Sequence, residues 1–334
     1  MYEVGREVSP PSRVHPYASR GCAPMPGDPV PIILDTDIGD DIDDMYALYL
    51  ALFHPGLDLR AVTTVHSSSL RKARFVGKAL RLAGVTDLPI GWGIDLSVGR
   101  AVIGQNQPDT GDLGTHLQWV GEGDPEMMAQ YPRAVEVILD QLDRTEEPIA
   151  LVSIGACSNL ADAISKATEK QRSMIRCIAL MSGEPNRQMP EHNVMCDPEA
   201  ADYVYSCGIT VFMGTYDVTR QLVLTMDEAE RRLGAEDTPT ARALLECTRL
   251  WAPHRGHKPG PVLYDLVPLL WLTDGSLVET RPSTIRVELQ GRYTRGMTVR
   301  TAPEGHVLES TAADGAALTE LSMETILKGA RQGA

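Results

Sequence analysis

Residues 30–44 read Val-Pro-Ile-Ile-Leu-Asp-Thr-Asp-Ile-Gly-Asp-Asp-Ile-Asp-Asp, an apolar run that ends in a dense group of aspartates. The apolar run predicts a buried strand, and the alternation of side chains beyond it places Asp35 and Asp37 on one face. The amphipathic segment 45–53 predicts a helix directly after the aspartates. We therefore expect the acidic group to lie between the carboxyl end of a strand and the start of a helix.

The density of negative charge in this segment is itself informative. Six aspartates fall within the ten residues 35–44, and a cation or an exposed surface must relieve their mutual repulsion. Ligands of open α/β sheets bind at the carboxyl ends of strands, and hard cations prefer carboxylate oxygens, so we favour a metal site. The alternative is a solvated acidic loop in which Asp43 serves as a helix N-cap.

The rest of the chain alternates between strand-like and helix-like segments. Strands are predicted at 58–65, 149–154, 176–181 and 209–213, and helices at 70–83, 131–143, 159–168 and 198–207. This alternation predicts an α/β fold with an open, mainly parallel sheet flanked by helices. Residues 284–301 predict a C-terminal β-hairpin, and residues 318–327 a final helix. We expect a flexible Pro/Gly-rich lead-in at residues 1–29 and a single domain at residues 30–330.

The composition excludes several classes of partner. The 334-residue chain has a formal net charge of −14, which would repel nucleic acid and anionic membranes. No apolar run reaches the length of a membrane span, and the first thirty residues lack the pattern of a secretory signal. The six cysteines are scattered along the chain and include no CxxC pair, so we expect them to be reduced thiols. We expect a cytoplasmic protein whose partner is a small molecule.

Three further polar clusters follow predicted strands. Residues 155–159 begin a predicted helix with Asn159 as its N-cap, and irregular backbone there could present a carbonyl to a cation. Residues 183–193 carry Glu and Asn side chains suited to hydroxyl recognition, although an ordinary polar loop has the same composition. Residues 260–268 place Asp265 among apolar neighbours, where a helix cap or a shared metal would relieve the cost of burying a carboxylate.

Taken in chain order, the four clusters resemble the calcium-dependent nucleoside hydrolases, the inosine–uridine-preferring ribohydrolase family. The family's DxDPGxDD-type, GPLTNIA-type, AEFN-to-DPEAA and HDPLA-type segments look like residues 35–44, 155–161, 191–201 and 264–268. The resemblance extends over about residues 31–330. It implies a single catalytic domain that hydrolyses the N-glycosidic bond of a ribonucleoside, giving ribose and the free base.

The resemblance also implies a role for each matched residue. Ca²⁺ would be held by Asp37, an aspartate of the 41–44 group, the backbone carbonyl of Ser158, and Asp265. Asp37 would also be the general base for a calcium-bound water that attacks the anomeric carbon. The residues matched to ribose contacts are Asp43, Ser68, Asn186, Glu191 and Asn193, and the resemblance implies that Glu191 and Asn186 lie nearest the 5′ end. Because the family commonly forms dimers or tetramers, a homodimer or homotetramer is expected.

The paired aspartates depart from the family's pattern. The stretch after Gly39 is two residues longer, so more than one match is possible. We favour Asp44 as the second metal ligand with Asp43 on ribose, and Asp41 is the alternative ligand.

The histidine that often precedes the late aspartate is Tyr264 in this chain. In the family that histidine is tied to protonation of the leaving base. Tyr264 would therefore be the catalytic proton donor, or a loop histidine would take this role. We expect His257, in the stretch before Asp265, to contact the substrate. Ser68 stands where the family has an asparagine, which weakens one substrate contact.

Two other activities compete with this interpretation. Asp35-Thr-Asp37 after an apolar strand resembles the start of a magnesium-dependent phosphatase of the haloacid-dehalogenase type, with Asp35 as nucleophile. That family expects Thr or Val where Gly39 stands, together with a later lysine and acidic pair that we do not find. The other alternative is a non-catalytic ribosyl-binding homologue, which would have no need of Asp37 and Asp265.

Overall fold

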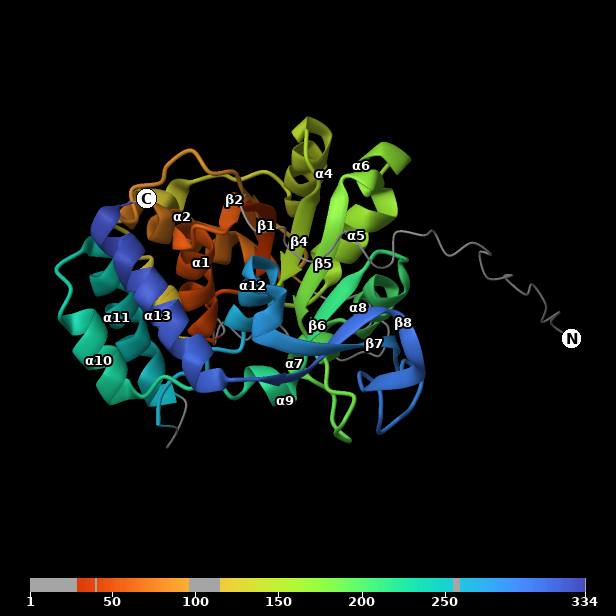
Figure 1. Cartoon of the computed structure of the whole chain (residues 1–334). Coiled ribbons are helices and arrows are strands. Elements are labelled where there is room, and N and C mark those ends of the chain that lie inside the picture. Colours follow the sequence, from red (N-terminus) through yellow and green to blue (C-terminus); the bar gives the residue numbers. More distant parts are fainter. Residues whose placement is uncertain (1–28, 40, 96–114, 255–258, 334) are drawn as a thin grey trace, which may run out of the picture.

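The protein is described by a computed structural model that covers residues 29–39, 41–95, 115–254 and 259–333 (Figure 1). Eight strands in these ranges form one sheet in the order β3-β2-β1-β4-β5-β6-β8-β7. The strands are β1 (Val30–Thr36), β2 (Leu57–Thr64), β3 (Ile90–Trp92), β4 (Ile149–Ser153), β5 (Ile175–Met181), β6 (Val211–Gly214), β7 (Val278–Val287) and β8 (Thr298–Ala313).

The direction of the strands confirms the predicted fold class. Neighbouring strands from β3 through β6 to β8 are parallel, and β7 pairs with β8 antiparallel. Because β1 lies inside the sheet between β2 and β4, all seven of its residues are buried. Strands buried on both faces are continuous apolar runs, which explains the composition of residues 30–34.

Helices cover both faces of the sheet (Figure 1). One core packs between the sheet and α1 (Asp43–Phe53), α2 (Ser69–Leu82), α10 (Met226–Gly234), α11 (Pro239–Trp251), α12 (Leu266–Thr273) and α13 (Gly315–Gln332). The second core involves α4 (Ala134–Arg144), α5 (Ser158–Lys166), α7 (His192–Cys196) and α8 (Pro198–Ser206). Shorter helices are α6 (Glu169–Ser173), α9 (Tyr216–Thr219), and the 3₁₀ turns η1 (Thr115–Trp119), η2 (Pro125–Met128), η3 (Ala252–His254) and η4 (Gly275–Leu277).

The C-terminal β-hairpin is present, but it is much longer than residues 284–301. Strand β8 continues to Ala313 and pairs in parallel with β6, so the hairpin extends the main sheet. Register shifts between β7 and β8 interrupt the alternation of side chains, and this concealed the full strand length in the sequence. The final helix begins at Gly315, three residues before the predicted start.

Two sequence-based expectations concern the ends and the surroundings of the chain. The predicted lead-in at residues 1–29 falls almost entirely on residues 1–28, which lie outside the described ranges, and the single domain at 30–330 stays a prediction. Within the described ranges, every helix is too short or too polar to cross a lipid bilayer.

Close packing of α13 on α1 anchors the helix whose first residues are Asp43 and Asp44. A Cβ placed on Gly329 would lie 2.2 Å from the ring of Phe53, near the end of α1. We predict that Gly329→Ala lowers the free energy of unfolding by about 1–3 kcal/mol, because the added methyl group overpacks this contact. Urea unfolding measures the change. Lys328→Ala, at the exposed neighbouring position, should change stability by less than about 0.5 kcal/mol. Equal effects would contradict the packing argument.

Candidate active site

Three buried carboxylates from two helix starts meet at one point of the sheet edge. Asp43 and Asp44 open α1, Asp265 directly precedes α12, and one oxygen from each lies within 4.8 Å of the others. None of the three is more than 4% exposed. The sequence reasoning named all three residues, and the structure brings them together from segments more than two hundred residues apart. The group therefore joins the start of the chain to its last third.

Asp37 lies at the same edge, directly after β1. A Cβ on Gly155 would lie 2.8 Å from Asp37 Oδ1, so the glycine leaves the space that this carboxylate occupies. The charge of Asp37 also raises the pKa of Asp44 and of Asp265, which places it among the same group of carboxylates. Asp41, at half-buried depth, accepts the N–H of Ile42 at 2.8 Å.

The electrostatics of the group favour a cation. Burial raises the pKa of Asp43, Asp44 and Asp265 well above the ordinary value, and repulsion between neighbouring carboxylates raises it further. The hydroxyl of Thr36 and the charge of Lys72 act in the opposite direction on Asp44. A set made of carboxylate oxygens matches the ligand preference of Ca²⁺ or Mg²⁺. The residues present therefore fit a hard divalent cation.

The helix-capping alternatives do not account for these carboxylates. The N-cap of α1 is Ile42, and Asp43 is the first helical residue. Asp265 occupies the N-cap position of α12, but its side chain makes no capping hydrogen bond. The interpretation of Asn159 as an N-cap is wrong, because α5 begins at Ser158 after Cys157. Asn159 lies inside the helix and points its amide toward β1.

Asn159 and Asp35 form a buried hydrogen-bonded pair. Asp35 Oδ1 accepts from Asn159 Nδ2 at 2.8 Å and from Thr63 Oγ1 at 2.6 Å. Asp35 Oδ2 has no hydrogen-bond partner among the residues that the structure describes. Complete burial, together with the charge of Asp37, raises the pKa of Asp35 to about 7, although its two hydrogen bonds act in the opposite direction. The Asp35–Asn159 pair therefore ties β1 to α5.

The turn between β4 and α5 brings Ser158 to this edge. Ser158 is buried, and its hydroxyl donates to Asp197 Oδ2 at 2.6 Å. Asp197 in turn accepts the N–H of Ala200 and caps α8. The hydroxyl is thus occupied in connecting two helices, so the carbonyl is the group of Ser158 that remains a candidate metal ligand.

The segment after β5, a loop that leads into α7, carries three of the expected ribose contacts. Glu191 is buried and accepts the N–H groups of Asn193 at 2.9 Å, Val194 at 3.3 Å and Gly183 at 3.0 Å. Asn193 donates its amide to the carbonyls of Ile154 and Met181. Both side chains therefore shape the loop, whereas the third residue, Asn186, is exposed.

Tyr264 is half-buried at the rim of the acidic group. Its ring stacks on Tyr216, with centroids 5.8 Å apart and an angle of 18° between the planes. Burial is the main cause that raises the pKa of Tyr264, and the nearby Tyr216, Asp43 and Asp41 add to it. The phenol is therefore a weaker acid than free tyrosine.

The segment after β2 holds a strained turn. His66, Ser67 and Ser68 have φ values of 59°, 50° and 56°, a conformation in which non-glycine residues are uncommon and which concentrates at functional sites. Their sequence gave no signal of it, because glycine is absent from all three positions. His66 Nε2 also lies 3.7 Å from the sulfur of Cys196.

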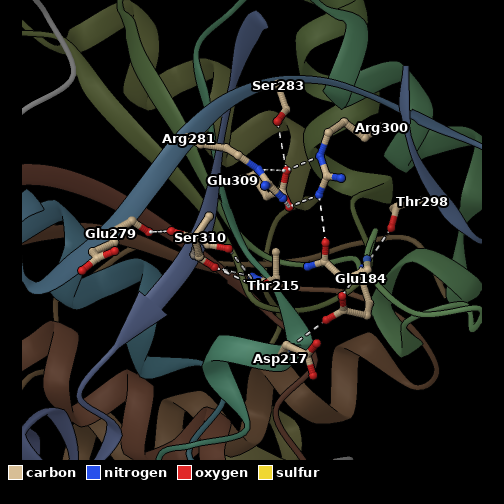
Figure 2. Close-up of polar contacts among 12 residues, drawn as sticks. Glu184, Thr215, Asp217, Glu279, Arg281, Ser283, Thr298, Arg300, Glu309 and Ser310 are labelled. Atoms are coloured by element: carbon tan, nitrogen blue, oxygen red, sulfur yellow. Dashed lines mark hydrogen bonds and ion pairs between the residues drawn. The ribbon is translucent and has the colours of Figure 1, made fainter. Parts of the chain in front are cut away.

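One predicted substrate contact is not described by the structure, and two residues near the loop after β5 were not predicted. His257 lies outside the described residues. Two residues of β8 were not predicted from the sequence: Arg300 donates to Asn186 in the loop after β5, and Glu309 accepts from Arg300 (Figure 2). No local pattern marks them, because Asn186 lies more than one hundred residues before Arg300, and Glu309 also binds Arg281 and Ser283 of β7.

The chain was compared with known proteins. Residues 32–324 match the family model described as inosine-uridine preferring nucleoside hydrolase. A pyrimidine-specific ribonucleoside hydrolase RihA of Enterobacter sp. (strain 638) is 33% identical over 282 residues, covering 81% of this chain and 87% of its own. The RihA of Escherichia coli O1:K1 / APEC is 32% identical over 280 residues, covering 81% of this chain and 88% of its own.

Solved structures share the fold. The purine-preferring ribonucleoside hydrolase from Gardnerella vaginalis superposes with a TM-score of 0.76 at 23% identity, over 90% of this chain and 99% of its own. The plant nucleoside hydrolase PpNRh1 gives a TM-score of 0.74 at 22% identity, over 90% of this chain and 99% of its own. The arrangement of sheet and helices is therefore that of these hydrolases.

A cation-free form should respond to pH in a defined direction. Carboxyls whose pKa is raised by folding stabilise the folded state below their unfolded pKa of about 4. That contribution is lost as the pH rises through the folded values, about 7 for Asp35. With chelator present, we predict that the melting temperature falls between about pH 5 and pH 8.

Adding Ca²⁺ at the upper end of this range should raise the melting temperature by about 5 °C or more, because the ion binds only the folded state. Differential scanning fluorimetry with and without chelator measures both effects. If neither chelator nor Ca²⁺ changes the melting temperature at any pH, the acidic group is merely solvated.

Proposed function

Because the chain belongs to the inosine-uridine preferring nucleoside hydrolase family and is thus an N-ribohydrolase, we propose that it uses Ca²⁺ and that Asp37 is its general base. The reaction is hydrolysis of the N-glycosidic bond of a ribonucleoside to ribose and free base. Family membership favours this activity over the phosphatase and over a purely ribosyl-binding protein. The observation that carries the calcium proposal is the buried group of Asp43, Asp44 and Asp265.

The proposed ligands of the cation are Asp37, Asp44, Asp265 and the carbonyl of Ser158, with Asp41 as the alternative to Asp44. These groups supply oxygen atoms only, as Ca²⁺ requires. When bound, the cation neutralises the carboxylates and lowers the pKa of a water molecule at the site. Asp43 is close enough to share the ion, and we assign it to a ribose hydroxyl.

The chain's own residues then carry the reaction. Asp37 accepts a proton from the attacking water, whose oxygen forms a bond to the anomeric carbon. The bond from that carbon to the base nitrogen breaks, and its electron pair leaves with the base. Positive charge that develops on the sugar is stabilised by the surrounding carboxylate oxygens. The departing base needs a proton, and Tyr264 is the proposed donor because it stands at the rim of this group.

We propose that ribose is bound by residues at three strand ends. They are Asp43, Ser68, Asn186, Glu191 and Asn193, with His257 as a further substrate contact. In this proposal Asn186 and Glu191 lie nearest the 5′ end of ribose. Asn193 donates its amide N–H groups to the carbonyls of Ile154 and Met181, so its side-chain oxygen is the atom that can accept a hydrogen bond from a ribose hydroxyl. A pyrimidine ribonucleoside such as uridine is the first candidate substrate, because the curated relatives are named pyrimidine-specific.

The wider setting follows from the same resemblance. We propose a cytoplasmic homodimer or homotetramer whose partner is a small ribonucleoside. The formal charge of −14 disfavours nucleic acid and anionic membranes as partners.

Replacing Asp37 tests the proposed base. We predict that Asp37→Asn lowers turnover by roughly a hundredfold or more, because the amide keeps the shape but cannot accept the proton. A reducing-sugar assay over a panel of ribonucleosides, with and without chelator, measures the loss. The matched control is Asp58→Asn on β2, a carboxylate paired with Arg60 whose replacement should leave turnover unchanged. Near-native activity of Asp37→Asn would contradict the assignment.

The weak acidity of Tyr264 predicts a dependence on the leaving group. We expect p-nitrophenyl riboside, whose leaving group departs without a proton, to be hydrolysed much faster than inosine or uridine. Tyr264→Phe should reduce turnover of the nucleosides several-fold more than turnover of the activated riboside. Comparing kcat on both substrates decides this. An equal loss on both would show that the phenol only packs against Tyr216.

A further inference from the structure

A buried carboxylate in the C-terminal hairpin holds two arginines at once. Glu309 on β8 is fully buried and accepts from Arg281 Nη2 at 2.8 Å, from Arg300 Nε at 3.0 Å and from Ser283 Oγ at 2.9 Å (Figure 2). Burial alone would raise the pKa of Glu309, but these hydrogen bonds outweigh it and lower the pKa. One ionised carboxylate thus faces two guanidinium groups, which leaves a positive charge in excess.

Arg300 extends this arrangement to the loop after β5. Its Nη2 donates to the side-chain oxygen of Asn186 at 3.0 Å, while the same guanidinium is held by Glu309. A hydrogen bond from a charged donor is stronger than one between neutral groups. Of the two arginines on Glu309, Arg300 also donates to Asn186, whereas Arg281 donates to the carboxylate of Glu309.

The backbone next to Asn186 is fixed by a second buried carboxylate. Glu184 accepts the N–H of Asn186 at 2.9 Å and the N–H of Asp217 at 2.8 Å. Its own N–H donates to Thr298 Oγ1 at 2.9 Å, two residues before Arg300 on β8 (Figure 2). The hairpin therefore fixes this loop at a backbone point and at a side-chain point.

We propose that Arg300 is a positioning residue that sets the orientation of the Asn186 amide for substrate. An amide group has one oxygen and one NH₂. Because Arg300 takes the oxygen, the two N–H donors are the groups left to meet the substrate. The inference rests on the proposed function, in which Asn186 lies at the 5′ end of ribose. It deepens that function: Arg300 leaves the N–H donors of Asn186 to face a hydrogen-bond acceptor, such as a hydroxyl oxygen, at the 5′ position of the riboside.

Because Asn186 is exposed, its contact with Arg300 can lower the entropic cost of ordering the side chain on binding. An exposed asparagine on a loop would otherwise sample several rotamers and both amide orientations, and ordering it on binding would cost entropy. A partner that is itself anchored by a buried carboxylate removes that cost before substrate arrives.

The test uses p-nitrophenyl riboside and its 5-deoxy analogue, so that no nucleobase preference enters. Arg300→Met should raise KM for the riboside roughly three- to tenfold, the size of one hydrogen bond, with kcat little changed. The 5-deoxy analogue should be affected less than about twofold. Arg281→Met is the matched control, because it removes a partner of Glu309 and leaves the hydrogen bond from Arg300 to Asn186 intact. This variant should change KM by the same factor for both substrates.

Asn186→Ala should reproduce the selective loss, and the double variant Arg300→Met/Asn186→Ala should lose no more than Asn186→Ala alone. Equal losses of Arg300→Met on both substrates, matching Arg281→Met, would overturn the proposal and leave the network a support for the hairpin. If Asn186→Ala does not distinguish the substrates, the 5′ contact and the role of Arg300 both fail, while the hydrolase function stands. If the wild-type protein hydrolyses neither these ribosides nor any ribonucleoside, the proposed function fails as well.

Discussion

Repulsion between buried carboxylates is the constraint on which this site depends. Asp43, Asp44 and Asp265 are withdrawn from water within a few ångströms of one another, and Asp37 adds its charge. Such an arrangement is costly unless protons or a cation compensate it. The fold offers partial relief, since Asp43 and Asp44 lie in the first turn of α1, where the helix dipole favours negative charge, and Lys72 is buried nearby. A divalent ion completes that balance.

The parallel sheet explains how distant segments reach one edge. β1, β4 and β5 run side by side in the same direction, so the residues that follow them emerge together. This brings Asp37, the turn of Ser158 and the loop of Glu191 into one region. Because the rule is topological, the sequence predicted the sheet, its α/β class and the edge at which the polar clusters gather.

What the sequence could not predict depends on contacts between segments that are distant in the chain. Arg300 and Glu309 lie on one strand that bulges, and their function emerges only when the loop after β5 is placed beside them. The position of Asn159 was misjudged because a residue suited to capping can equally serve inside a helix when a buried carboxylate such as Asp35 needs a donor. The strained turn at 66–68 could not be predicted either, because neither histidine nor serine indicates a positive φ in the way that glycine does.

If a divalent cation compensates the charge of the buried aspartates, X-ray diffraction can locate the ion between them. Crystals grown with Ca²⁺ should be recorded at a wavelength where calcium scatters anomalously. We expect an anomalous peak among Asp37, Asp43, Asp44 and Asp265, with carboxylate oxygens at about 2.3–2.6 Å from it. An ordered, calcium-saturated crystal with no peak in that region, or with its peak elsewhere on the chain, would contradict it.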